Sequence, residues 1–282
     1  MNIAITGASG LVGQVLTERL RRTGHQTRPI SVRTAPQPAA LEGCEAVIHL
    51  AGEPVSQRWT RSVRERIRAS RVEGTRGLVT AIAGLARPPE VLISASAVGY
   101  YGSRGDEILT ESASSAEDFL GRVCVEWERE ALQAEKLGAR VVTLRIAMIL
   151  DQHGGALKRM LLPFRLGLGG RIGNGRQWMS WIHMHDLAAL VEFALENPSL
   201  RGAVNASAPN PVTNAEFTRE LAHAIHRPAI MPVPRIALRV LYGQMAEIIY
   251  GSQRVVPDAA LKAGVQFQFP EIGPALRDLL QS

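Results

Sequence analysis

The sequence of 282 residues has few cysteines, few lysines and no long hydrophobic run. Its two cysteines, Cys44 and Cys124, stand far apart and outside any metal-ligand spacing, which argues against a disulfide framework and a zinc site, so we expect no metal. No apolar stretch approaches the ~18 residues of a membrane-spanning helix, and the chain opens on a strand-like run instead of a signal peptide. These absences predict a cytoplasmic protein with no membrane partner.

What the sequence does contain is the composition of an ordinary globular protein, 46% hydrophobic and 21% charged. Its net charge of +6 allows a polyanionic partner, and basic residues are concentrated from Arg58 to Arg71. No helix-turn-helix, zinc-finger or aromatic RNP pattern accompanies them, so we interpret the run as a solvated helix face and expect no nucleic acid. Arg71, which ends the run, is instead assigned to an anionic cofactor.

Strand-like and helix-like patterns alternate along the first 150 residues. This alternation is typical of a parallel sheet with both faces covered, so the predicted fold is α/β, a doubly wound parallel (Rossmann) sheet with a smaller, mostly helical C-terminal substrate region. The expected strands are Ile3–Thr6, Thr27–Val32, Ala46–Leu50, Val91–Ser96 and Val141–Ile146, and the expected helices are Leu11–Arg22, Val63–Gly84 and Asp118–Leu137.

A glycine-rich stretch and a group of prolines divide the chain into three predicted segments. Residues 1–165 form the dinucleotide-binding core, residues 166–227 the substrate-side loops and returning core elements, and residues 228–282 a small C-terminal helical domain. In the middle segment Asp186 is expected to cap a helix, and Thr213 to Glu216 form a capping box.

Glycines stand at positions 7, 10 and 13, between the first strand and the first helix. In this place Gly7 allows a tight turn, Gly10 lets the backbone approach a pyrophosphate, and Gly13 lets the helix pack closely on the strand. Free N–H groups and the dipole at the start of a helix favour anions. The loop therefore predicts dinucleotide binding by Gly7, Ser9, Gly10, Leu11, Val12 and Gly13.

The end of the second strand indicates which dinucleotide binds. An acidic residue there would hydrogen-bond the ribose of NAD, whereas an arginine accommodates the 2′-phosphate of NADP. The segment from Arg28 to Arg33 contains no acid, and none follows before Glu42, so the predicted cofactor is NADP(H). Ser31 and Arg33 are the expected ligands of the 2′-phosphate, with Arg28 as the alternative.

Several short motifs are shared with a known superfamily. They are Thr6-Gly-Ala-Ser-Gly-Leu-Val-Gly13, His49-Leu-Ala-Gly52, Ser94-Ala-Ser96 with Tyr101-Gly102, Leu144-Arg145 and Trp181-Ile-His-Met-His-Asp186. With them the chain resembles the extended short-chain dehydrogenase/reductases, and in particular an atypical NAD(P)-dependent epimerase-like branch with an extra C-terminal domain of unassigned role. The resemblance implies that Leu50, Ala51 and Gly52 line the adenosine and ribose region and that Ser96 is the active-site hydroxyl.

The sequence lacks the superfamily's catalytic tyrosine with a lysine four residues later. In that pair the ammonium and the cofactor lower the pKa of the phenol, so that it exchanges a proton near neutral pH. Counted from Ser96, the two positions fall near Phe119 or Leu120 and near Val123 or Cys124. None of these four side chains can replace the pair.

Two other side chains are candidates for chemistry. Tyr100 follows Ser96 on the loop over the expected nicotinamide site and is the candidate proton donor. Glu128 lies on the helix that carries the superfamily's pair, either as a chemical carboxylate or as a surface or salt-bridge residue. In members of the superfamily that act on nucleotide sugars, an arginine binds the diphosphate of the substrate. This sequence has Met179 at that position, which argues against a nucleotide-sugar substrate.

These patterns predict an NADP(H)-binding oxidoreductase or epimerase-like enzyme that acts on a small carbonyl or alcohol. Ser96 would polarise the substrate oxygen, and the proton would come from Tyr100, bound water or the substrate. Tyr101, Trp178 and Trp181 are expected to line the pocket. The alternative is a catalytically silent NADP(H)-binding protein with a regulatory or cell-division-associated role. The predicted partner is a small-molecule substrate, and the oligomeric state is left open.

Overall fold

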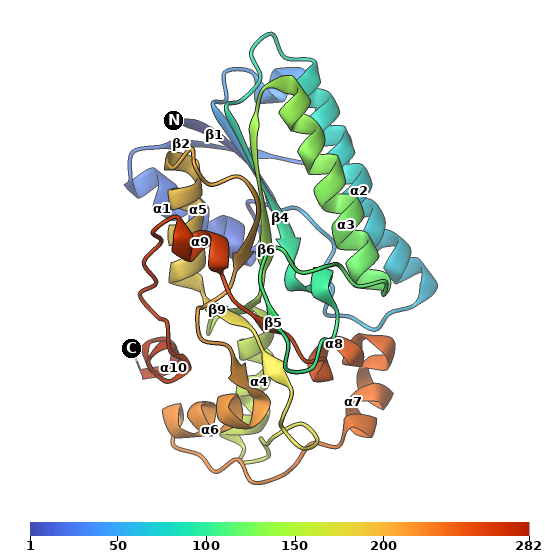
Figure 1. The fold of residues 1–282 in the computed structure, drawn as a ribbon, viewed down its shortest axis with the longest axis vertical. Coiled ribbons are helices and arrows are strands. Elements are labelled where there is room, and N and C mark those ends of the chain that lie inside the picture. Colours follow the sequence, from blue (N-terminus) through green and yellow to red (C-terminus); the bar gives the residue numbers. More distant parts are fainter. Residues whose placement is uncertain (282) are drawn as a thin grey trace.

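The computed structural model describes residues 1–281 and contains one six-stranded parallel sheet (Figure 1). The strands, in their spatial order, are β10 (Gly202–Ala206), β6 (Arg140–Ile146), β4 (Val91–Ala97), β3 (Ala46–His49), β1 (Asn2–Thr6) and β2 (Gln26–Ile30). The chain moves outward from β1 to β2 and then returns to the other side of β1 with β3. The carboxyl ends of β1 and β3 therefore flank the switch point where open α/β sheets bind ligands.

Both faces of the sheet are buried under helices (Figure 1). Helices α1 (Leu11–Arg22) and α5 (Met184–Glu196) cover one face, and α2 (Arg61–Ala83) and α3 (Phe119–Leu132) cover the other. Ile3 and Ile5 belong to the first of these cores, whereas Ala4, between them, belongs to the second. Because successive strand residues point to opposite faces, this double burial explains the continuous apolar runs of the strands.

The predicted doubly wound α/β fold is confirmed, and every strand and helix expected in the first 150 residues is present with small shifts at its ends. The largest shift is at the end of α3, where the predicted helix continues from Gln133 to Leu137 as a 3₁₀ turn that Gly138 closes in a left-handed conformation, with φ of 89°. No helix among residues 1–281 is long and apolar enough to cross a bilayer.

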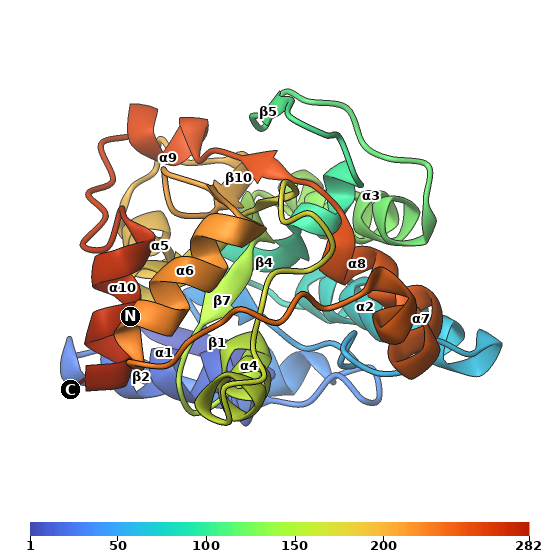
Figure 2. The ribbon, with the colours of Figure 1, turned by 90° about the horizontal axis from the view of Figure 1, so that it is seen from below.

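Below the carboxyl ends of the strands lies a second group of elements, which we call the lower lobe (Figures 1 and 2). Its helices are α4 (Gly155–Arg165), α6 (Asn214–Ala224), α7 (Arg235–Tyr242), α8 (Ala246–Tyr250) and α10 (Ile272–Gln281). Its short strand pairs are β7 (Met148–Leu150) with β9 (Trp181–His183), β8 (Trp178–Met179) with β11 (Val212–Thr213), and β5 (Ile108–Leu109) with β12 (Arg254–Val255).

The lower lobe has a hydrophobic core of its own, which includes Leu157, Trp181, Phe217 and Leu276. Helix α9 (Asp258–Lys262), by contrast, returns to the main sheet and packs against β10. The C-terminal segment therefore contributes to both cores, and the three-segment division of the chain stays a prediction. Thr213 caps α6 as expected, since its hydroxyl accepts the N–H of Glu216 at 3.2 Å.

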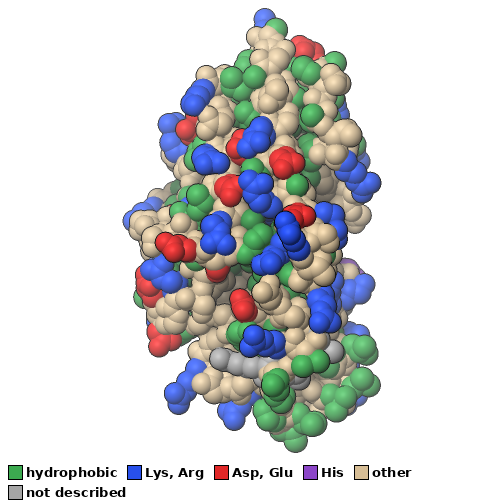
Figure 3. Space-filling view, turned by 90° about the vertical axis from the view of Figure 1, so that its right-hand side faces the viewer, with side chains coloured by type: hydrophobic (Ala, Val, Ile, Leu, Met, Phe, Trp, Pro, Cys, Tyr) green, Lys and Arg blue, Asp and Glu red, His purple; other side chains and the backbone are tan. Residues whose placement is uncertain are grey.

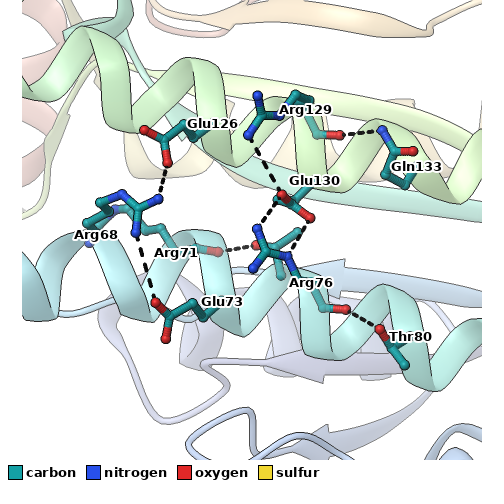
Figure 4. Close-up of polar contacts among 10 residues, drawn as sticks. Arg68, Arg71, Glu73, Arg76, Thr80, Glu126, Arg129, Glu130 and Gln133 are labelled. Atoms are coloured by element: carbon teal, nitrogen blue, oxygen red, sulfur yellow. Dashed lines mark hydrogen bonds and ion pairs between the residues drawn. The ribbon is translucent and has the colours of Figure 1, made fainter.

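The basic run from Arg58 to Arg71 enters α2, and acidic side chains of α3 face this helix (Figure 4). Arg68 forms an ion pair with Glu126, and Arg76 donates two hydrogen bonds to Glu130 at 2.8 and 3.1 Å. Positive and negative side chains thus interleave along the seam between the two helices.

The expectation that Asp186 caps α5 is wrong. The helix begins before it, with His183 as the N-cap residue, whose ring nitrogen Nδ1 accepts a main-chain N–H at 3.1 Å. The buried carboxylate of Asp186 instead accepts the main-chain N–H groups of Gln268 and Phe269, both at 2.9 Å. Asp186 therefore fixes the C-terminal segment against α5, a role that local spacing does not reveal.

We expect Asp186→Asn to lower the free energy of unfolding by about 2 to 3 kcal/mol, because an amide loses the charge that two buried N–H groups bind and presents an NH₂ to one of them. Urea denaturation of the full chain measures this effect. The matched control is Asp258→Asn, at an exposed ion pair with Lys262, for which we expect a loss below about 1 kcal/mol. Equal losses for the two variants would contradict the assigned role.

Candidate cofactor and active site

The turn after β1 is closed by contacts that only glycine permits. Gly7 has a positive φ of 70°, and its carbonyl accepts the N–H of Gly10 at 2.9 Å. A Cβ at Gly13 would lie 2.2 Å from that same carbonyl oxygen, and a Cβ at Gly7 would lie 2.9 Å from the backbone of Ala51. The structure therefore packs α1, the turn and the end of β3 at backbone contact distance.

The first turn of α1 carries no acidic residue, and no side chain caps it. Leu11 and Val12 begin the helix directly after Gly10, so their main-chain N–H groups remain for an anion. Ser9 is exposed beside them. The residues predicted to bind the pyrophosphate thus come together at one helix tip, which fits the paired phosphates of a dinucleotide.

A chain of buried hydrogen bonds holds this tip against β3 and α2. The hydroxyl of Thr6 lies 2.6 Å from Nδ1 of His49, and Nε2 of His49 lies 2.8 Å from the hydroxyl of Thr75. Burial, and then the charge of Arg71, lowers the pKa of His49 to about 4, so the imidazole is neutral at physiological pH. The same Thr6 oxygen accepts the N–H groups of the two residues that follow β3.

Leu50, Ala51 and Gly52 follow β3 at this edge; the first two are half-buried and Gly52 is exposed. Arg71 supports them from α2: its guanidinium would lie 3.2 Å from a Cβ at Gly52, and it donates to the carbonyl of Glu53 at 3.0 Å. Burial lowers the pKa of Arg71, although Cys124 and Glu53 partly offset this effect. Arg71 therefore lies behind the backbone of the predicted ribose wall, and its contact with a cofactor stays a prediction.

Ser31 and Arg33 lie just beyond β2, at the edge of the sheet that holds the glycine turn, because Thr6 pairs with Ile30 in parallel register. Both side chains are exposed. The alternative, Arg28, is already engaged, since its guanidinium donates to the carbonyls of Ala40 and Glu42 at 3.2 and 3.0 Å. This geometry favours Arg33 as the residue available to a 2′-phosphate.

The lower lobe touches the glycine turn and the loop after β3. A Cβ at Gly154, the N-cap of α4, would lie 2.7 Å from the side chain of Leu11. One turn into α4, Arg159 donates to the main-chain carbonyl of Ser56 at 2.9 Å. The start of α4 therefore lies beside the glycine turn and is joined to the loop after β3.

Ser96, at the end of β4, is buried and lies in a network of charged groups. Its hydroxyl donates to Oε1 of Glu128 at 2.6 Å. Arg145 of β6 binds the same carboxylate with two hydrogen bonds of 2.9 Å. Burial disfavours the charge on Arg145, but the hydrogen bonds and charge of Glu128 outweigh it and raise the pKa of the guanidinium above its usual range. Glu128 is thus a buried salt-bridge residue, and the surface alternative for it is wrong.

The network continues from Arg145 across the sheet edge. Its guanidinium donates to the hydroxyl of Tyr101 at 2.9 Å, and Tyr101 donates to Oδ1 of Asn205 at 2.7 Å. It also stacks on the ring of Tyr100, 3.5 Å from the ring centre. Tyr100 is half-buried beside this cation, and its role as proton donor stays a prediction.

The positions expected for the superfamily's pair face this network from α3. Leu120 packs on Gly99, where an added Cβ would lie 3.2 Å from the leucine side chain. Cys124 lies 3.7 Å from the carbonyl of Ala97, and burial, followed by the charge of Glu128, raises the pKa of its thiol to about 12. Neither side chain exchanges a proton near neutral pH.

Two of the three aromatic residues expected in the pocket lie elsewhere. Tyr101 and Trp181 are fully buried, in the polar network and in the core of the lower lobe, because each finds a partner for its polar atom inside the protein. Trp178 is half-buried, donates to Asp106 at 2.9 Å and stacks under Arg254. Only Trp178 of these three remains near the surface.

Comparison with known protein families shows which family the chain belongs to. The model described as the NAD dependent epimerase/dehydratase family matches residues 3–207, and one described as a domain of unknown function, DUF1731, matches residues 233–279. The chain belongs to the NAD dependent epimerase/dehydratase family. The resemblance drawn from the motifs is therefore confirmed, including the additional C-terminal domain.

Members of this family match the chain along its whole length. An epimerase family protein of Mycobacterium tuberculosis is 40% identical, with 97% of this chain and 96% of that protein covered. Human epimerase family protein SDR39U1, solved with NADPH, is 32% identical with a TM-score of 0.92, and both chains are covered completely. A UDP-glucuronic acid 4-epimerase of Bacillus cereus, with a TM-score of 0.81 at 14% identity, shares the fold.

Sequence reasoning missed two parts of this family member's site. His49 was visible only as part of a shared motif, and nothing local indicated that it bridges Thr6 and Thr75. Asn205 binds Tyr101 and also donates to the carbonyl of Val256 in the C-terminal segment at 2.9 Å. Asn205 was visible as part of a shared Asn205-Ala-Ser207 motif and as the single asparagine of an apolar strand, but neither signal indicated its partners.

We expect Arg33→Ala to weaken NADPH binding by about 10- to 100-fold and to leave NADH binding nearly unchanged, because only NADPH carries the phosphate that the guanidinium binds. Fluorescence titration with each reduced coenzyme measures both affinities. Arg28→Ala is the matched control and should retain the preference of the unmodified protein. Equal weakening of the two coenzymes by Arg33→Ala would exclude Arg33 as the phosphate ligand.

We expect Glu128→Gln to lower the free energy of unfolding by about 3 to 5 kcal/mol, because it leaves the buried Arg145 without a counter-ion. Glu130→Gln, on the same helix, removes an ion pair with the exposed Arg76 and should cost less than about 1 kcal/mol. Urea denaturation compares the two. A small loss at Glu128 would show that the network does not hold the sheet edge together.

Proposed function

We propose that the protein is an NADP(H)-dependent oxidoreductase that transfers hydride between the nicotinamide and a small carbonyl or alcohol. One observation carries the proposal: α1 begins with neither an acid nor a capping side chain, at the switch point of a parallel sheet. The NADPH in the structure of the human relative supports the same cofactor here. A cytoplasmic location stays a prediction.

Three parts of the cofactor have candidate residues at this edge of the sheet. The glycine turn would hold the paired phosphates through main-chain N–H groups, Ser31 and Arg33 the 2′-phosphate, and Leu50 to Gly52 the ribose region. When bound, the coenzyme supplies or accepts the hydride. The chain itself must orient the substrate and move the proton.

The hydrogen bond of Ser96 indicates which of two hydroxyl groups, that of Ser96 or that of Tyr100, can transfer a proton to or from the substrate. Ser96 already donates its proton to Glu128, so toward a substrate it can offer only its lone pairs. Such a hydroxyl orients an alcohol by accepting its hydrogen bond, and while its proton is bound to Glu128 it does not polarise a carbonyl oxygen as the sequence led us to expect. We therefore assign proton transfer to Tyr100 or to a bound water, with Ser96 in the orienting role.

A catalytically silent cofactor-binding protein is the second candidate. The observation that favours it is the apolar packing of Leu120 against Gly99 and the protonated thiol of Cys124, at the positions where the superfamily carries its working pair. A regulatory protein of this kind would bind the coenzyme without turnover.

The decisive experiment measures NADPH binding and turnover on the same preparation. We expect saturable binding and steady oxidation of NADPH with at least one member of a panel of aldehydes, ketones and quinones. If Tyr100 is the proton donor, Tyr100→Phe should lower kcat by about 100-fold or more without changing NADPH affinity, whereas an unchanged kcat would assign the proton to bound water. Binding without turnover across the panel would favour the silent candidate, and no binding would exclude both.

A further inference from the structure

Hydrophobic side chains gather at one end of the molecule (Figure 3). This end is formed by α4, α7 and the segment 227–234 that leads into α7 (Figure 2). Seven of the eleven large hydrophobic side chains exposed among the described residues lie there, between 53% and 81% exposed. We call this group the basal face; it consists of Leu162, Leu166, Leu168, Ile230, Met231, Ile236 and Val240. Single exposed leucines are ordinary, but a cluster of this kind marks an interaction surface.

The two stretches of sequence that include the basal face contain no acidic residue. Residues 152–185 and 221–246 carry eight lysines and arginines and no aspartate or glutamate. The other 24 basic and all 26 acidic residues of the chain lie outside them and nearly balance. The whole positive excess of the protein is therefore concentrated in these two segments.

The basic side chains around the basal face are available for a partner. Lys158, Arg165, Arg171, Arg227 and Arg239 are exposed, and none of them forms an ion pair with another described residue. This differs from the seam between α2 and α3, where arginines are paired with glutamates (Figure 4).

A hollow of about 530 Å³ opens beside the basal face, and its lining contains basic and apolar residues but no acid. Arg171, His223, Arg227 and Ile230 contribute to it. Its wall is built by close backbone packing, since a Cβ at Gly170 would lie 1.7 Å from the carbonyl oxygen of Met231. The main-chain N–H of Val233 also donates to the carbonyl of Arg171 at 2.8 Å.

We propose that the basal face binds the surface of an anionic phospholipid bilayer. A lipid offers a phosphate next to an apolar region, which matches guanidinium groups beside exposed leucines and isoleucines. A second copy of the chain would bring the same positive segments together and is disfavoured by their repulsion. The expectation of no membrane partner rested on the lack of a spanning helix, and a surface contact needs none.

Vesicle sedimentation of the full-length protein tests this surface. We expect binding to phosphatidylcholine vesicles that contain one-third phosphatidylglycerol, little binding to pure phosphatidylcholine, and weaker binding in high salt. Because apolar side chains would insert, the double variant Leu162→Ser, Leu166→Ser should lower the partition coefficient by about tenfold or more. Arg171→Gln with Arg227→Gln should lower it by a similar factor.

Matched controls use side chains of the same kind elsewhere on the molecule. Ile108→Ser with Leu261→Ser changes two other exposed hydrophobic residues, and Arg22→Gln with Arg87→Gln changes two other exposed arginines. Both control variants should bind the vesicles as the unmodified protein does. NADPH titration and thermal unfolding should be unchanged in the basal variants, which shows that the fold and the cofactor site are intact.

Three outcomes would overturn the proposal. Absence of binding to the anionic vesicles at low salt would exclude a bilayer and leave an acidic protein surface as the partner. Unchanged vesicle binding by the leucine variant would mean that the protein adsorbs through its positive charge alone, without insertion of apolar side chains. Equal losses in the basal and control variants would show that the basal face has no special part in the contact.

Discussion

The buried ion pair between Glu128 and Arg145 is the contact on which the site depends. It joins α3 to β6, receives the hydroxyl of Ser96 from β4, and extends through Tyr101 and Asn205 to β10 and the C-terminal segment. Two charges remain in the interior only when their hydrogen bonds are satisfied, so each partner restricts the position of the others. The carboxyl edge of the sheet and the covering C-terminal segment are thereby fixed together.

This arrangement also distinguishes the protein from enzymes of its superfamily that use a tyrosine and a lysine. Arg145, the cation that stacks on the ring of the candidate phenol, comes from β6 and is neutralised by a carboxylate of α3, while α3 carries Leu120 and Cys124 at the positions expected for the pair. A charge that is already paired stabilises a neighbouring anion less than a free ammonium does. The chemistry proposed for this site therefore rests on hydroxyls and on the bound coenzyme.

The lower lobe connects the two functional surfaces proposed for the molecule. Its helix α4 begins against Leu11, at the glycine turn, and ends among the exposed leucines of the basal face. The C-terminal segment likewise reaches from the basal face to the loop after β4, where Gln253 donates to the carbonyls of Val98 and Gly102. A partner bound below would therefore touch elements that also border the cofactor site.

The sequence by itself determined the doubly wound sheet, the glycine turn and the absence of an acid after β2, because apolar periodicity and glycine spacing are local patterns that act within a few residues. Tertiary structure decided the rest. In the folded protein Arg28 is hydrogen-bonded to main-chain carbonyls and Arg33 is exposed. Tyr101 and Trp181 are buried, and Asp186 binds a segment about 80 residues away. Which polar groups meet in the interior depends on how distant elements pack, and no local pattern records that choice.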